Sequence, residues 1–253
     1  MPFDASPSAS QQLGRAHTDC ALCPVQTCLA RCGSREQTDA WVDILSPRMA
    51  VMPGAGALFN AGDRLRAVFS VRGGCIKAFT VDADGNERIR GFYLPGDLIG
   101  LDALADGHCL ATAAAVVPSQ VCVAPLQEMK RLVRRQPELA QRLIEQTSRE
   151  LAAALALSGD YSAEQRLAAF LLNMRERLGS QQAMRLPMAQ RDIGNYLRLA
   201  TETVCRTLKG FERKGWLSLE DKQLRFLDVR ALYHTADAVG LCIPPDTQLQ
   251  HAA

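Results

Sequence analysis

The sequence predicts an α+β chain with an N-terminal antiparallel β-roll, a long helix and a C-terminal winged helix–turn–helix. Three observations support this fold class: short apolar runs separated by glycine-rich turns, a later stretch with leucine, or threonine at position 147, at every fourth residue, and two amphipathic helices followed by two short strands. On this pattern the 253 residues divide into a cysteine-rich segment (1–40), the β-roll (41–124), a helical section (125–160), the winged helix–turn–helix (161–240) and a tail (241–253).

The β-roll is predicted from apolar runs such as IKAFTV (76–81) and QVCVAP (120–125), which turn signals such as DADGN (82–86) and PGD (95–97) separate. Asp84–Gly85 predicts a tight hairpin, because glycine readily adopts the positive φ that such turns need. Many short strands at near-regular spacing are typical of a roll, barrel or sandwich.

The long helix is predicted to begin at Pro137 and to stop at Gly159. Its stripe of mainly apolar residues comprises Leu139, Leu143, Ile144, Thr147, Leu151 and Leu155. This stripe has two interpretations: the helix packs on its own β domain, or it pairs with its twin across a two-fold axis in a homodimer. The sequence favours neither over the other.

Two helices joined tightly at 198–200 and followed by the strands WLSL and LRFL have the pattern of a helix–turn–helix with a β-wing. Gly194 in the first helix is expected to allow close helix approach, and Thr201 to cap the second helix. The second helix places charged residues on one face and apolar residues on the opposite face, the charged set being Glu202, Arg206, Lys209 and Arg213 and the apolar set Val204, Leu208 and Phe211.

The charged face has the chemistry of a major-groove reader. Arginine at 206 can bond the O6 and N7 of guanine, and glutamate at 202 can accept from the amino group of cytosine, so together they can read one G·C pair. Lys209 and Arg213 suit phosphates. A solvated face with an ion pair one turn apart is the alternative, and the helix–turn–helix frame with its wing favours DNA reading.

The bulk composition excludes several classes of protein. A net charge of only +2 argues against wholesale binding to polyanions, so a nucleic-acid surface must be a local basic face. Residues 1–19 carry no apolar export signal, and the longest apolar run, LAAALAL (151–157), is too short to cross a bilayer. We therefore expect a cytoplasmic protein without a disulfide framework, although it has nine cysteines.

Four of those cysteines gather in the polar stretch DCALCPVQTCLARC, at Cys20, Cys23, Cys28 and Cys32. Four thiols in a polar segment cannot all be core residues, so metal binding or redox chemistry is the better interpretation. A thiol oxidoreductase using CALC is disfavoured, because such enzymes place the pair at a helix N-terminus after a strand and no βαβ pattern lies nearby.

The stretches GFYLPGDLIG (91–100), SAEQRLAAFL and QRDIGNYLRLATETVCRTLKGFERKGWL resemble the CRP–FNR family of bacterial transcription regulators, from about residue 20 to about residue 235. Within it, the chain is most similar to the oxygen-sensing fumarate-and-nitrate-reduction branch. The resemblance implies a cyclic-nucleotide-binding-like sensor roll in a regulator that is not an enzyme. Cyclic AMP is not expected as the ligand, because Leu101, Ala111 and Thr112 stand where cyclic-nucleotide receptors carry Glu and Arg-Ser.

The resemblance implies a [4Fe–4S] cluster held by Cys20, Cys23, Cys28 and Cys122. The spacing C-x2-C-x4-C-x3-C departs from the best-known C-x2-C-x5-C of that branch, so Cys32 is the alternative third ligand. A self-contained zinc or cluster site of the four N-terminal cysteines is a further alternative, as are haem sensing and thiol oxidation at Cys20 and Cys23.

By the same resemblance, Glu202 and Arg206 read the G·C pair of a TTGAT half-site, with an uncharged residue, Thr201, before them. Cys205 stands where the family usually has a serine that contacts the neighbouring thymine, and a thiol donates only weakly. The implied mechanism is that the intact cluster favours a dimer on two half-sites, and that oxygen destroys the cluster and releases the DNA. RNA polymerase is the expected protein partner, with the 82–86 hairpin as a contact.

Overall fold

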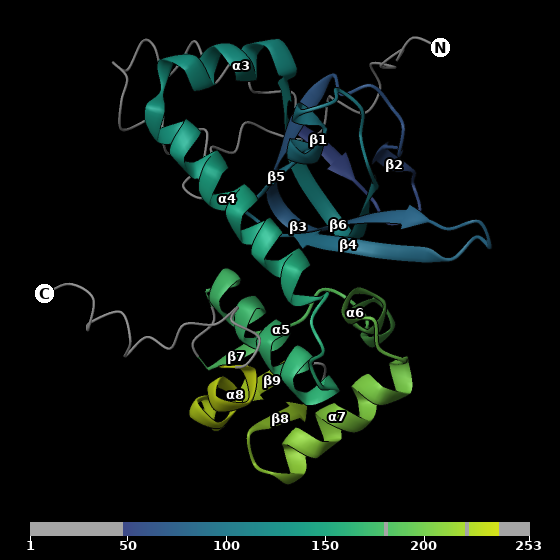
Figure 1. Cartoon of the computed structure of the whole chain (residues 1–253), viewed down its shortest axis with the longest axis vertical. Coiled ribbons are helices and arrows are strands. Elements are labelled where there is room, and N and C mark those ends of the chain that lie inside the picture. Colours follow the sequence, from purple (N-terminus) through teal and green to yellow (C-terminus); the bar gives the residue numbers. More distant parts are fainter. Residues whose placement is uncertain (1–47, 180–181, 221–222, 238–253) are drawn as a thin grey trace, which may run out of the picture.

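The computed structural model describes residues 48–179, 182–220 and 223–237. Figure 1 shows two lobes, a β-roll with α3 above and a winged helix–turn–helix below, with α4 running along the roll toward their junction. The predicted fold class is confirmed. The predicted cluster ligands at 20, 23, 28 and 32 lie outside the described residues.

The β-roll consists of two long strands, β3 (Ala67–Val81) and β6 (Thr112–Pro125), flanked by shorter ones. The antiparallel order is β1-β6-β3-β4, with β2 on β6 and β5 on β3; the shorter strands are β1 (Arg48–Val51), β2 (Ala57–Phe59), β4 (Glu87–Tyr93) and β5 (Leu98–Ile99). Register shifts around Cys75 bend the β3–β6 pair. Gly74 is required at this bend, because its φ is 84° and an added Cβ would lie 2.2 Å from Ser119 Oγ.

The predicted hairpin between β3 and β4 is confirmed in its turn chemistry. The Asp82 carboxylate accepts the backbone N–H groups of Asp84 and Asn86 at 3.1 and 2.8 Å. Gly85 has a φ of 83°, the left-handed conformation for which glycine was expected.

A short 3₁₀ turn, η1 (Leu101–Leu104), follows β5, and two helices, α3 (Leu126–Arg135) and α4 (Pro137–Ala156), follow β6. Pro137 begins α4 as predicted. One face of α4 packs on the roll, where Leu139 is fully buried beside Val68 and Leu98. On another face Ile144, Leu151 and Leu155 are 59%, 61% and 65% exposed.

The predicted stripe on this helix therefore merges two faces. Assigning Leu139 to a dimer contact is wrong, because its side chain has no surface left outside its own core. Leu143 is half-buried against the same core, whereas Thr147 is exposed and its hydroxyl donates within α4 to the Leu143 carbonyl. The exposed residues Ile144, Leu151 and Leu155 remain candidates for contact with a second copy of the chain.

The winged helix–turn–helix is built from α5 (Ala163–Arg177), α6 (Gln190–Leu197), α7 (Thr201–Arg213) and α8 (Val229–Ala236), with a three-stranded sheet β7-β9-β8. The strands are β7 (Ala183–Arg185), β8 (Leu217–Glu220) and β9 (Gln223–Phe226), of which β8 and β9 match the predicted wing. Ser162 and Gln165 form a reciprocal capping box that begins α5. The core of this lobe includes Leu167, Leu171, Ile193, Val204, Leu208 and Phe211.

Thr201 does not cap α7, so that prediction is wrong. The N–H groups of Thr203 and Val204 already bond the Ala200 carbonyl, which makes Ala200 the N-cap and places the Thr201 side chain beyond the capping position. Within the described residues, no helix has both the length and the apolar character needed to span a bilayer.

Candidate nucleic-acid interface

The joint between α6 and α7 fixes the helix–turn–helix. Arg198 adopts a left-handed conformation (φ 58°, ψ 42°), and the Leu199 N–H bonds the Gly194 carbonyl at 2.8 Å. A Cβ on Gly194 would lie 2.8 Å from the Leu199 carbonyl oxygen and 3.4 Å from Val204 Cγ2. The close approach predicted at this glycine is confirmed.

α7 presents its charged residues to solvent and buries its apolar residues, as predicted. Glu202, Arg206, Lys209 and Arg213 are exposed, whereas Val204, Leu208 and Phe211 are buried in the lobe. In the described part of the chain Glu202 and Arg206 form no ion pair with each other, and the Arg206 guanidinium makes a long bond to Thr203 Oγ1 at 3.4 Å. Both side chains are therefore available to a ligand in front of α7.

Cys205 differs from these residues, because it lies half-buried between the two helices. Its thiol donates to Gln190 Oε1, at the start of α6, at 2.6 Å. Gln190 was not singled out from sequence, since its proximity to Cys205 depends on how α6 crosses α7.

Cys122 is the one predicted cluster ligand within the described residues, and it lies half-buried on β6. In the antiparallel register it is opposite Arg48 of β1 on one side and Ser70 of β3 on the other. β1 is the first described strand, and Arg48 at its start is the residue opposite Cys122. No group of three or more His, Cys, Asp or Glu side chains in the described ranges could by itself hold a metal.

Two other cysteines of the roll are unsuited to metal or redox chemistry. Cys75 is fully buried between the two lobes, and this burial raises the pKa of its thiol to about 12. Burial, followed by the nearby Asp102 and Asp63 carboxylates, raises the pKa of the Cys109 thiol. Their sulfurs are protonated at neutral pH.

We expect iodoacetamide at pH 8 to alkylate Cys205 well before Cys75 in the folded chain. Alkylation requires the thiolate, which at a pKa of about 12 is only about one part in ten thousand of Cys75 at this pH, and burial also blocks the reagent. Peptide mass spectrometry of timed samples measures the two rates. In denaturant the two residues should react alike; equal rates in the folded chain would contradict the buried placement of Cys75.

The three residues expected at the cyclic-nucleotide positions of the roll take part in the protein's own packing and hydrogen bonding. Leu101 and Ala111 are buried, and the Thr112 hydroxyl accepts the Ala61 N–H at 3.0 Å. These side chains provide neither the carboxylate nor the guanidinium that a ribose and a cyclic phosphate require.

Comparison with known proteins gives a consistent picture. Residues 165–235 match the Crp-like helix-turn-helix domain, and residues 53–136 match the cyclic nucleotide-binding domain. The chain is 34% identical over 233 residues to the fumarate and nitrate reduction regulatory protein of Escherichia coli strain K12, covering 89% of this chain and 93% of that protein. It is also 34% identical over 229 residues to the protein of the same name from Salmonella typhimurium strain LT2, covering 87% and 91%.

Solved structures with the same fold include FixK2 from Bradyrhizobium japonicum, with a TM-score of 0.66 and 27% identity over 74% of this chain and 96% of that chain. A CRP-family transcriptional regulator from Thermus thermophilus has a TM-score of 0.62 and 21% identity over 76% and 97%. The second likeness concerns the fold alone.

Proposed function

The chain belongs to the CRP–FNR family of transcription regulators, and we propose that it is an oxygen-responsive member that binds palindromic TTGAT-type sites as a dimer while a [4Fe–4S] cluster is intact. The family members are DNA-binding regulators and not enzymes. The name of the E. coli and Salmonella relatives, which refers to fumarate and nitrate reduction, supports a role in controlling anaerobic or microaerobic metabolism. We propose that the protein acts in the cytoplasm.

The observation that carries the cluster proposal is the place of Cys122 opposite β1. Cys32 lies sixteen residues before Arg48, and an extended chain of that length reaches up to about 50 Å. Cys20, Cys23 and Cys28 are therefore within chain reach of Cys122, with Cys32 as the alternative third ligand. Thiolates of this number and kind fit a [4Fe–4S] cluster, which when bound supplies an oxygen-labile link between the N-terminal segment and the roll.

The DNA proposal rests on the free face of α7. Glu202 and Arg206 are exposed, one helical turn apart, and are the pair proposed to read the G·C of the half-site. Lys209 and Arg213 lie further along the same face and suit phosphates, and Thr201 adds an uncharged group at the helix start. Because the Cys205 thiol is engaged by Gln190, we expect only weak preference at the base pair that Cys205 faces.

The dimer proposal rests on the exposed residues of α4. Ile144, Thr147, Leu151 and Leu155 lie outside the core that Leu139 and Leu143 join, and burial of this face against a second copy would remove apolar surface from water. Two linked recognition helices would then meet two half-sites one helical turn apart. RNA polymerase is the proposed protein partner, through the ordered hairpin at 82–86.

Anaerobic purification tests the proposal through metal content. We expect a brown protein with about four iron and four sulfide per chain, and loss of both in Cys20→Ala, Cys23→Ala and Cys122→Ala. Cys28→Ala and Cys32→Ala, measured separately, identify the third ligand. Cys109→Ala is the matched control, because that thiol is buried in the same roll and away from β1.

DNA binding completes this test. The wild-type protein should bind a TTGAT palindrome under argon and release it in air, and Cys122→Ala should bind weakly in both. A sharp Soret band, zinc alone, or affinity indifferent to oxygen would contradict the cluster proposal and favour a haem, zinc or thiol sensor on the same fold.

A further inference from the structure

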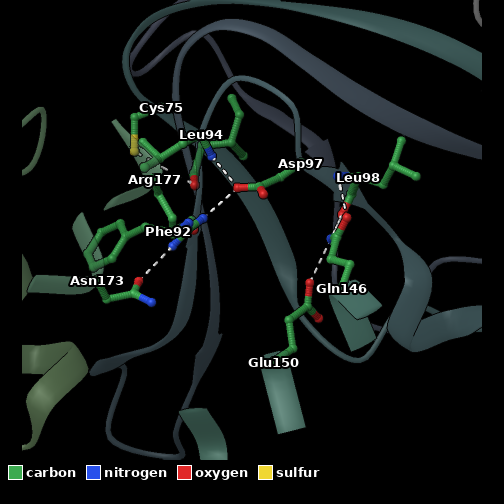
Figure 2. Close-up of polar contacts among 10 residues, drawn as sticks. Cys75, Phe92, Leu94, Asp97, Leu98, Gln146, Glu150, Asn173 and Arg177 are labelled. Atoms are coloured by element: carbon green, nitrogen blue, oxygen red, sulfur yellow. Dashed lines mark hydrogen bonds and ion pairs between the residues drawn. The ribbon is translucent and has the colours of Figure 1, made fainter. Parts of the chain in front are cut away.

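The turn between β4 and β5 binds α4 and the DNA-binding lobe through neighbouring residues (Figure 2). This turn, Leu94–Leu98, is itself closed by the Asp97 N–H bonding the Leu94 carbonyl, and is tied to β3 by reciprocal bonds of Val71 with Gly96 and Asp97, all at 3.0 Å. It is therefore a fixed part of the roll.

On one side, the turn is hydrogen-bonded to α4. Gln146 is 7% exposed, and its amide accepts the Leu98 N–H at 3.0 Å and donates to the Leu98 carbonyl at 2.7 Å. The same amide nitrogen donates to Glu150 Oε1 at 2.8 Å. Burial raises the pKa of Glu150, whose charged and titratable neighbours are Asp97, Asp102, Arg177, Tyr93 and Tyr196.

On the other side, the turn is hydrogen-bonded to α5 of the DNA-binding lobe. Arg177 donates to the Phe92 carbonyl at 2.8 Å and to Asp97 Oδ2 at 2.5 Å, and the same carboxylate oxygen accepts the Leu94 N–H at 2.7 Å. Figure 2 shows the guanidinium between Phe92 and Asp97, with Gln146 on the far side of the turn. Such charge-assisted bonds, made from a half-buried arginine, are stronger and more directional than neutral ones.

A second attachment joins the helix–turn–helix itself to the roll. Asn195 of α6 accepts the Ile89 N–H and donates to the Glu87 carbonyl, both at 2.7 Å, so its side-chain amide pairs with the outer edge of β4 as a neighbouring strand would. Beside it, the rings of Phe92, Phe170 and Tyr196 pack with centroids 5.5 to 6.3 Å apart.

The segment that connects α4 to α5 is also hydrogen-bonded to the DNA-binding lobe. Arg166 of α5 donates to the carbonyls of Gly159 and Tyr161 in that connection and to the carbonyl of Leu197 at the end of α6, at 2.9 to 3.1 Å. One guanidinium thus joins the connection to the helix–turn–helix.

These contacts constrain the orientation of the DNA-binding lobe relative to the roll, and they leave the charged face of α7 uncovered. A connection of six residues, 157–162, would by itself let the lobe pivot about α4, whereas attachments at α5 and α6 oppose rotation about it. Glu202, Arg206 and Lys209 remain exposed on α7 and make none of these contacts.

We propose that Arg177 and Asn195 are positioning residues that fix the recognition helix α7 relative to α4, and so set the half-site spacing that a dimer accepts. The inference rests on the proposed dimeric DNA binding. Loosening the attachments leaves each α7 able to bind one half-site, but lowers the effective concentration of the second α7 at its half-site. Affinity for correctly spaced pairs falls, and altered spacings are tolerated better.

The test uses the full-length protein purified anaerobically and three DNA duplexes: two half-sites one helical turn apart, the same pair with two base pairs inserted, and a single half-site. Fluorescence anisotropy measures affinity for wild type, Arg177→Ala, Asn195→Ala and Arg177→Lys. Arg131→Ala is the matched control, because it removes an arginine from an exposed ion pair with Glu128 on α3, away from the junction.

We expect Arg177→Ala and Asn195→Ala to lose about tenfold in affinity for the correctly spaced pair, to change less than about twofold on the single half-site, and to discriminate less against the insertion. Arg177→Lys keeps the positive charge but lacks the planar guanidinium that bonds both Phe92 and Asp97. Its affinity for the correctly spaced pair should therefore lie between those of Arg177→Ala and wild type. Arg131→Ala should match wild type on all three duplexes.

Other results would overturn the inference. An equal loss on the single half-site means that the variants damage the fold of the lobe. A gain in affinity for the correct pair means that the contacts hold a non-binding orientation. If the variants discriminate between the correct and the altered spacing as wild type does, Arg177 and Asn195 do not position α7. If wild type binds none of the three duplexes specifically, the proposed function fails, and this inference fails with it.

Discussion

Replacing Arg206 with alanine should abolish discrimination at the G·C pair of the half-site. A guanidinium that bonds guanine in bidentate fashion contributes about 1–3 kcal/mol of discrimination against the wrong base. In the structure this side chain is exposed and has a long contact with Thr203, so little of the lobe's own packing is lost with it. Competition between duplexes carrying each of the four base pairs at that position measures the effect.

Lys209→Ala is the matched comparison, because it removes a charge from the same exposed face. We expect it to weaken all four duplexes alike and to reduce the slope of log affinity against log salt by about one. If the two variants behave identically, the assignment of base reading to Arg206 and phosphate binding to Lys209 is wrong.

Gly194→Ala should destabilise the DNA-binding lobe and weaken binding to every sequence. The added methyl would lie 2.8 Å from the Leu199 carbonyl oxygen, a backbone atom that cannot rotate away, so α6 and α7 must separate. Overpacking of this kind costs about 1–3 kcal/mol. Thermal unfolding followed by circular dichroism, together with affinity for the palindrome, measures both consequences.

Gly210→Ala provides the matched control for stability. It lies within α7, and an added Cβ there meets nothing within 4 Å, so the better helix propensity of alanine should raise stability by about 0.5–1 kcal/mol. Equal destabilisation by the two variants would show that the close approach at Gly194 is not the cause.

The features that the sequence predicted well are those fixed by neighbouring residues. The hairpin at 82–86 follows from the bonds of Asp82 to its own turn, and the two faces of α7 follow from helical periodicity. The glycine at the α6–α7 joint was also predictable, because the helix–turn–helix pattern itself requires a close approach there.

Features that depend on distant contacts were missed or misjudged. On α4, leucines occur on both the buried and the exposed face, so periodicity could not separate Leu139 from Leu151. Gln146 is buried because its amide meets the backbone of Leu98, 48 positions away, and no apolar pattern reports such a contact. The error at Thr201 has a local cause instead, because the first turn of α7 already closes on the carbonyl of Ala200.

The lateral order of strands in the roll brings distant parts of the chain close together. Arg48, Cys122, Ser70 and Leu98 stand in one row across β1, β6, β3 and β5, and Gln146 of α4 holds the last of them. Because adjacent strands lie about 4.8 Å apart, Cys122 is about 10 Å from the backbone that α4 grips. A displacement at Cys122 would therefore cross only two ladders of backbone hydrogen bonds before it reached the residue that α4 holds.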